Sequence, residues 1–178
     1  MAKVFQSPIE LRVDSSAWVL GGSGSPADKI AAVNDPNGLP DDGEGYLECE
    51  TTAGNEDRIS FNFPPMPEAI SVVAVRIHIR SEEEEGVANH APFITRATTH
   101  YDGGGLSLAL GVYADHSYEW TLDPATGLPW SKAGVDESGA GVVQAAADAG
   151  ARLPQIVGEV EFVPFSVKSV AALEVGSR

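Results

Sequence analysis

The sequence predicts an all-β protein, folded as an antiparallel two-sheet, jelly-roll-like β-sandwich with one short helix and extended terminal arms. Most apolar runs place an apolar residue at every second position, as half-buried strands do. Short clusters rich in Gly, Asn and Asp separate these runs, as in antiparallel sheets. Helix-forming stretches are scarce. Together these three observations favour a sandwich or a barrel.

Composition limits the class of protein. With 178 residues, 43% of them hydrophobic and 21% charged, the chain holds enough apolar material for one globular core. A single cysteine, Cys49, excludes an intramolecular disulfide framework and indicates synthesis in a reducing compartment. A formal net charge of −15 repels phosphate groups, so we expect neither direct nucleic-acid binding nor membrane binding, and no apolar segment has spanning length.

The strands follow from alternation. Val73, Val75, Ile77 and Ile79 alternate with polar residues and make the clearest case. Pro64 ends another such run, because proline cannot donate to a strand ladder. A strand-like segment around Cys49 predicts a small buried thiol. The predicted strands cover residues 9–13, 46–51, 58–63, 72–80, 106–112 and 156–163.

Helix is expected at one place. Ser131 is a candidate N-cap, and the glycines that follow it keep the helix short. The alanine-rich run 144–149 is expected to add a turn or two of helix before Pro154. The acidic run Glu82–Glu85 is interpreted as an exposed hairpin tip. The expected organisation is an N-terminal arm with the first strand in 1–30, the sandwich in 31–164 and a C-terminal arm in 165–178.

Metal binding has one weak candidate. Oxygen ligands for calcium crowd into one acidic segment. Leu39, Pro40 and Tyr46 stand where the helix-loop-helix calcium template needs a ligand, a glycine and a glutamate. A solvated acidic loop is therefore the favoured interpretation, and we expect no cofactor. The candidate ligands are Asp35, Asn37, Asp41 and Asp42.

No catalytic pattern stands out, so we expect a protein that is not an enzyme. A Gly-x-Ser-x-Gly elbow and a phosphate-binding loop are both absent from the sequence. The acidic residues are too many for any one pair to indicate glycoside hydrolysis. The four histidines lack metal-ligand spacing and are interpreted as surface residues in or near loops or on a polar strand face: His78, His90, His100 and His116.

The segment from Tyr118 to Trp130 is the most informative part of the chain. Asp123-Pro124 starts a turn, Gly127 accommodates a positive φ, and the resulting corner returns Trp130 to the body of the fold. The alternation places Tyr118 and Trp120 on one face. Two interpretations remain open. The favoured one is that these aromatics close the end of the core, and the other is that they form a stacking platform for a glycan.

This corner also carries a resemblance. An Asp-Pro-x-Thr-Gly-x-x-Trp motif after an aromatic strand, then a short helix and a valine-rich strand, is similar to the C-terminal part of a family of tailed-bacteriophage virion proteins. The motif 33–36, the acidic turn 41–43, Tyr46, and the runs 57–61 and 72–80 resemble the N-terminal half of that family. The resemblance spans roughly residues 33–164. It departs at Asp123, where asparagine is expected more often.

The resemblance implies a bacteriophage virion structural protein on the exterior of the particle, made in the host cytoplasm. An outer capsid decoration or auxiliary protein is the first expectation, and a neck or tail position is the alternative. Its partners would be the major capsid protein or other virion proteins, and it would form a homo-oligomer, most plausibly a trimer. A different alternative is a carbohydrate-binding jelly-roll module for host surface recognition.

The apolar residues of the two ends are candidates for assembly contacts. An arm that docks onto neighbouring subunits would use them, whereas an ordinary edge strand or frayed terminus explains them equally well. The residues concerned are Phe5, Phe165, Val167 and Val170.

Overall fold

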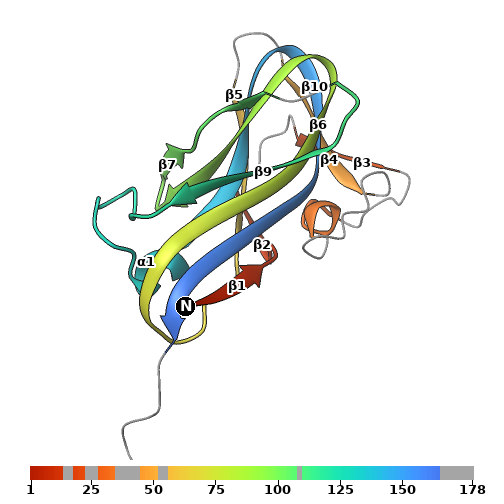
Figure 1. The fold of residues 1–178 in the computed structure, drawn as a ribbon. Coiled ribbons are helices and arrows are strands. Elements are labelled where there is room, and N and C mark those ends of the chain that lie inside the picture. Colours follow the sequence, from red (N-terminus) through yellow and green to blue (C-terminus); the bar gives the residue numbers. More distant parts are fainter. Residues whose placement is uncertain (14–17, 23–27, 35–44, 52–55, 108–109, 165–178) are drawn as a thin grey trace, which may run out of the picture.

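The fold is a two-layer antiparallel β-sandwich built on one long ribbon of two strands, β6 (Ala69–Arg96) and β10 (Ser138–Pro164). The computed structural model describes residues 1–13, 18–22, 28–34, 45–51, 56–107 and 110–164. β6 and β10 pair from Ala69 opposite Pro164 to Arg96 opposite Ser138. Both strands arch over at one end of the molecule, so each contributes one half to each layer (Figure 1).

The other strands flank this ribbon. In the front layer, β1 (Ala2–Gln6) pairs with β10 and β9 (Ala114–Trp120) pairs with β6, so the strand order is β1-β10-β6-β9. In the back layer, β5 (Glu56–Asn62) lies beside β10, and β2 (Glu10–Val13) lies beside β5. β7 (Thr99–Asp102) and β8 (Leu106–Ser107) lie beside β6. Near the arch, β4 (Tyr46–Thr51) and β3 (Trp18–Gly21) extend the sheet from the middle of β10.

The core lies between the two layers. In β6, Val75, Ile77 and Ile79 are buried, while Arg76 and Arg80 face outward, as the alternation predicts. The prediction is wrong for Val73, which is exposed while Ala74 is buried, because the register with β10 shifts at this point. Each fully buried aliphatic or aromatic side chain contributes roughly 1.5–3 kcal/mol. The fully buried residues that meet them from the other strands include Trp18, Leu47, Ile59, Phe61, Leu153 and Ile156. The predicted class, an all-β sandwich of two antiparallel layers, is therefore confirmed.

The helix prediction is confirmed at one place and wrong at the other. α1 (Lys132–Asp136) begins after Ser131, whose Oγ accepts a hydrogen bond from Gly134 N at 2.9 Å. A 3₁₀ turn, η1 (Ala31–Val33), is the other helical element in the described part of the chain, and no described helix is long and apolar enough to cross a membrane. Residues 144–149 belong to β10 instead. There β10 bonds to β5 and to β6, and these ladders outweigh the helix propensity of alanine.

Two further predictions are corrected near the arch. The run Glu82–Glu85 is part of β6 and is not an exposed hairpin tip, since Glu82 and Glu83 are buried. Of the predicted strand 106–112, residues 106–107 form β8, and residues 108–109 lie outside the described part of the chain. Gly111 has a φ of +64°, which breaks the strand, and Leu110 and Val112 are 65% and 56% exposed.

The N-terminal segment is also corrected. Residues 1–30 contribute β1, β2 and β3 to the sandwich, and Trp18 is fully buried, so this segment is not a separate arm. Phe5 lies on β1, an edge strand that pairs with β10 opposite Glu159. The predicted C-terminal arm with Phe165, Val167 and Val170 lies outside the described residues, as does the acidic loop with Asp35, Asn37, Asp41 and Asp42.

The histidines lie on strands rather than in loops, and His90 is fully buried in β6. Its ring lies 5.7 Å from that of Trp18, centroid to centroid. Gln144 Nε2 donates to the Cys49 carbonyl at 3.3 Å, which leaves Gln144 Oε1 to accept from His90 Nε2 at 3.3 Å. The sequence interpretation of His90 as a surface residue is therefore wrong, whereas that of Cys49 as a buried thiol is confirmed.

The burial of His90 predicts acid sensitivity. Burial lowers the pKa of His90 from 6.5 to about 4, helped by the nearby His116 and opposed by the bond to Gln144. The unfolded chain then binds one more proton than the folded protein between those values. The free energy of unfolding should therefore decrease by roughly 3 kcal/mol as the pH drops from 6.5 to 4.

Urea denaturation between pH 6.5 and pH 4 measures this decrease in the free energy of unfolding. The variant His90→Gln should lose most of the decrease, because it has no imidazole to protonate. Imidazole NMR titration assigns the group. A titration of His90 near 6.5 in the folded protein would contradict the prediction.

Candidate functional site

The corner after β9 turns its tryptophans into the core. Trp120 and Trp130 are 8% and 3% exposed, and Trp130 Nε1 donates to the Trp120 carbonyl at 2.9 Å. Tyr118 is 37% exposed, and its ring packs edge-on to Trp120 with a centroid distance of 4.6 Å. This burial is the arrangement that closes the end of the core, so a stacking platform of all three rings is not present.

Asp123 holds the corner in shape. Its amide donates to the Leu128 carbonyl at 2.9 Å, and Gly127, with a φ of +68°, donates back to the Asp123 carbonyl at 2.8 Å. The Asp123 carboxylate is buried, accepts from Ala125 N at 2.9 Å and lies 3.6 Å from Arg96. An aspartate at this position therefore adds a charge interaction that asparagine would lack.

A network of charged side chains covers the outer face of the front layer, and Glu159 is its centre. The Glu159 side chain is only 4% exposed. Its Oε1 lies 2.7 Å from Lys3 Nζ and 2.6 Å from Arg76 Nη1, and its Oε2 lies 3.0 Å from His78 Nε2. Arg76 also pairs with Glu161 and Glu119. We call these residues the Glu159 cluster: Lys3, Arg76, His78, Glu119, Glu159 and Glu161.

Strand register brings this cluster together. Phe5 on β1 lies opposite Glu159 on β10, Glu159 opposite Arg76 on β6, and Arg76 opposite Glu119 on β9. All four strands turn these residues to the same side, because successive side chains alternate between faces. The alternation of Glu159 and Glu161 and of Arg76 and His78 is visible in the sequence. Their meeting is not, because it depends on pairing between distant segments.

The contacts decide the charge state of Glu159. Burial alone would raise its pKa, but the hydrogen bonds from Lys3, Arg76 and His78 more than offset burial and hold the pKa below its ordinary value of 4.5. Arg76 responds in the opposite direction, since its bonds to Glu159 and Glu161 overcome burial and raise its pKa. Both groups therefore stay ionised at neutral pH.

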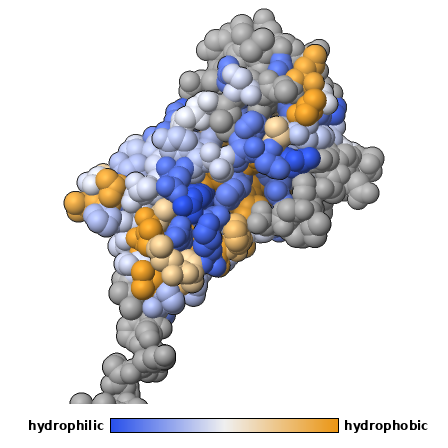
Figure 2. All heavy atoms as spheres, in the orientation of Figure 1, coloured by the Kyte–Doolittle hydropathy of each residue, from blue (hydrophilic) through white to orange (hydrophobic). Residues whose placement is uncertain are grey.

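An exposed aromatic ring borders the cluster. Phe5 is 46% exposed, and its ring centroid lies 6.2 Å from that of His78, with the two planes tilted by 45°. Figure 2 shows a hydrophilic band that crosses this face, with apolar side chains along its lower margin. The face thus combines one open apolar ring with a dense set of hydrogen-bonding groups.

A second polar cluster lies further along the same face, near the arch. Arg152 Nη1 donates to Glu82 Oε1 at 3.0 Å, and its guanidinium lies 4.8 Å from the centre of the Tyr46 ring. Burial raises the pKa of Tyr113, and Glu82, which the Tyr113 hydroxyl contacts, raises it further. We call Tyr46, Glu82, Tyr113 and Arg152 the Glu82 cluster.

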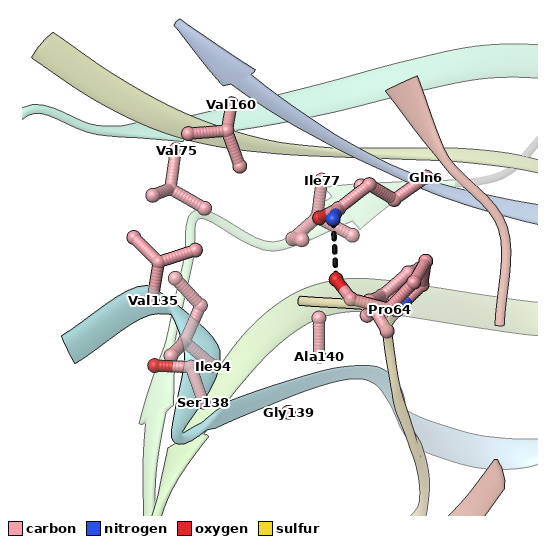
Figure 3. A pocket seen from close by; sticks show the side chains of 12 residues that line it. Gln6, Pro64, Val75, Ile77, Ile94, Val135, Ser138, Gly139, Ala140 and Val160 are labelled. Carbon is pink, nitrogen blue, oxygen red and sulfur yellow. Dashed lines mark hydrogen bonds between the residues drawn. The ribbon is translucent and has the colours of Figure 1, made fainter. Parts of the chain in front are cut away.

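One small cavity opens between the layers beside α1 (Figure 3). Its volume is about 30 Å³, and aliphatic side chains from both layers line it, among them Val75, Ile77 and Ile94. Gln6 bonds across its mouth to the Pro64 carbonyl. The space holds one or two waters and is too small for a sugar ring. Within the described ranges, no group of three or more His, Cys, Asp and Glu side chains is placed to hold a metal ion.

Comparison with known proteins shows that the fold of this chain is similar to that of solved β-sandwich structures. No family model matches the chain, and no curated protein matches it. Among solved structures, the CBM22-1 and GH10 modules of Clostridium thermocellum endo-1,4-β-D-xylanase 10B, complexed with xylohexaose, superpose with a TM-score of 0.53 and 6% identity. That match covers 92% of this chain and 29% of the xylanase. The C-terminal CBM6 of LamC, a marine laminarinase of Zobellia galactanivorans, superposes with a TM-score of 0.50 and 8% identity, covering 90% of this chain and 100% of that module. At these identities the shared feature is the β-sandwich itself.

Glu159→Gln should destabilise the protein at neutral pH, because Lys3, Arg76 and His78 would surround a neutral amide. A loss of about 1–3 kcal/mol is expected from a buried carboxylate that loses its charge. Since the folded pKa of Glu159 is lowered, its contribution exists above pH 4.5 and disappears as the pH falls below that value.

Urea denaturation of the wild type and of Glu159→Gln at pH 7 and at pH 3 tests this prediction. The difference in their free energies of unfolding should be smaller at pH 3. Glu161→Gln is the matched control, because the Glu161 side chain is more exposed than that of Glu159 and its ion pair within the cluster is with Arg76. Equal losses for the two variants would contradict the central role of Glu159.

Proposed function

We propose that this chain is a non-catalytic β-sandwich module that binds carbohydrate on the outer face of its front layer. The observation that carries the proposal is the exposed Phe5 ring beside the Glu159 cluster. A sugar ring presents an apolar C–H face, which stacks on an aromatic ring, and a rim of hydroxyls, which pair with charged hydrogen-bonding groups. The face offers both kinds of partner side by side.

The cluster is also held rigid for binding. Lys3, Arg76 and His78 all bond to the one buried carboxylate of Glu159, so their positions are set before a ligand arrives. A preorganised surface loses less conformational entropy on binding. His78 donates from Nε2 to Glu159, which leaves its Nδ1 as an acceptor in the neutral ring.

The chemistry of Glu159 favours binding over catalysis. A general acid at neutral pH needs a carboxyl group with a raised pKa. Glu159 instead has a lowered pKa and both of its oxygens are engaged. This carboxylate therefore suits a positioning role for its three neighbours.

The fold likeness supports the proposal by analogy. Both matched structures contain carbohydrate-binding modules, and one of them was determined with xylohexaose. Analogy of fold alone does not assign a ligand, so the proposal depends on the face of this chain.

Phe5→Ala should weaken glycan binding at least tenfold with little change in stability, because the ring is nearly half exposed and stacking is its main contribution. Isothermal titration with xylose- and glucose-based oligosaccharides measures the change. Leu128→Ala is the matched control, since Leu128 is 63% exposed but lies on the corner after β9. Glycan binding that survives Phe5→Ala unchanged would move the site away from this face.

A second candidate function is a virion structural protein, either an outer decoration or auxiliary protein or a neck or tail component. The specific observation in its favour is the sequence of the corner from Asp123 to Trp130, which resembles the phage motif except at Asp123. In the structure this sequence forms a turn with a positive φ at Gly127 and a buried Trp130. The strong negative charge suits a protein displayed outside a DNA-filled shell. We propose other virion proteins as its partners and a homo-oligomer, such as a trimer, as its assembled state. The two functions are compatible, because a glycan-binding face on the particle exterior would contact the host surface.

Sedimentation of DNA-filled particles from the native source tests the virion candidate. We expect the chain to co-sediment with particles, at a ratio to the major shell protein near one for a decoration protein. A handful of copies per particle would indicate a neck or tail position instead. Absence from purified particles would refute the virion candidate and leave carbohydrate binding standing.

A further inference from the structure

We infer that the ligand of this face is an uncharged, extended oligosaccharide that runs along β6 from Phe5 to Tyr46, rather than a single terminal sugar or an acidic one. This inference rests on the proposed carbohydrate function and adds to it a length and a charge class. Three features of the described residues carry it: a continuous row of polar side chains, aromatic rings at both ends of the row, and the pairing of every cation along it.

The row follows one strand. Arg76, His78, Arg80 and Glu82 occupy alternate positions of β6 and stand on the same outer face. At about 3.3 Å per residue, the row from Arg76 to Glu82 is roughly 20 Å long, the length of several sugar rings joined end to end. Arg80 stands between the two clusters on β6. It bonds to Asp115 at 3.0 Å and lies 5.6 Å from the centre of the Tyr113 ring, which belongs to the Glu82 cluster.

Aromatic rings stand at both ends of the row. Phe5 borders the Glu159 cluster at one end. At the other end, the partly exposed rings of Tyr46 and Tyr113 belong to the Glu82 cluster, where Arg152 packs on Tyr46. A single sugar would reach the rings at only one end. A chain of sugars laid along the row would stack on Phe5 at one end, contact the exposed parts of Tyr46 and Tyr113 at the other, and meet hydrogen-bonding groups between them.

The charges along the row exclude acidic sugars. Lys3, Arg76, Arg80 and Arg152 are the cations, and each lies within 3.0 Å of a carboxylate oxygen. Five carboxylates face these four cations: Glu82, Asp115, Glu119, Glu159 and Glu161. A uronic acid would add a negative charge where each cation already has a partner, in a chain whose net charge is −15. A neutral sugar meets no such repulsion.

Oligosaccharide ladders test both parts of the inference. Isothermal titration would use neutral xylose- and glucose-based ladders from one to six units, with a galacturonic acid ladder of the same lengths, at fixed ionic strength. We expect affinity for a neutral ladder to rise at least tenfold between the disaccharide and the hexasaccharide. The galacturonic acid hexamer should bind at least tenfold more weakly than the neutral hexasaccharide that binds the protein.

A variant at the Tyr46 end of the row tests whether the longer ligand gains its affinity from contacts at that end. Tyr46→Ala should lower affinity for the neutral hexasaccharide at least fivefold and leave the disaccharide unchanged. The Tyr46 ring packs on Gly21, so a folding defect is checked by circular dichroism. The control is Tyr101→Ala, on β7 of the back layer. NMR of the unmodified protein gives an independent readout: the hexasaccharide should shift signals of both Phe5 and Tyr113, and the disaccharide only those of Phe5.

The outcomes distinguish the two proposals. If no ladder binds, the carbohydrate function fails, and this inference with it. If sugars bind at Phe5 but the disaccharide binds as tightly as the hexasaccharide, or the acidic ladder as tightly as the neutral one, the inference is overturned while the function stands.

Discussion

The pairing of β6 with β10 is the constraint on which the rest of the structure depends. The two strands bond to each other along nearly their whole length and arch over together, so one ribbon supplies the centre of both layers. Every other strand attaches to an edge of this ribbon or to a strand that does. Ile77, Ile79, Ile59 and Phe61 share one buried core, because the arch brings the two halves of the ribbon face to face.

The same ribbon creates two polar environments with opposite consequences. On its inner side, His90 is enclosed among Trp18 and Gln144 and is held neutral by burial. On its outer side, Glu159 is shielded by Lys3, Arg76 and His78 and is held charged by their hydrogen bonds. Burial is nearly complete in both cases, so the number and charge of the partners decide the protonation state.

The candidate site is a property of the sheet surface rather than of loops. Its residues come from β1, β6, β9 and β10, whose backbones are fixed by their ladders. A site on strands keeps its geometry better than one on loops, which suits recognition of a ligand with regularly repeated units. The corner at Asp123 contributes indirectly, because Trp130 bonds back to Trp120 at the end of β9 and closes the core under that strand.

The sequence by itself determined the features that depend on near neighbours. Alternation identified which side of residues 75–80 faces the core, Ser131 marked the start of α1, and the Asp123-Pro124 turn predicted the corner. Tertiary structure alone decided the rest. The alanine-rich run 144–149 is a strand, Glu82 is buried against Arg152, and His90 lies in the core, because each depends on which distant strand pairs beside it. The Glu159 cluster has the same origin: its residues lie on four strands, and only the register between those strands brings their charges within bonding distance.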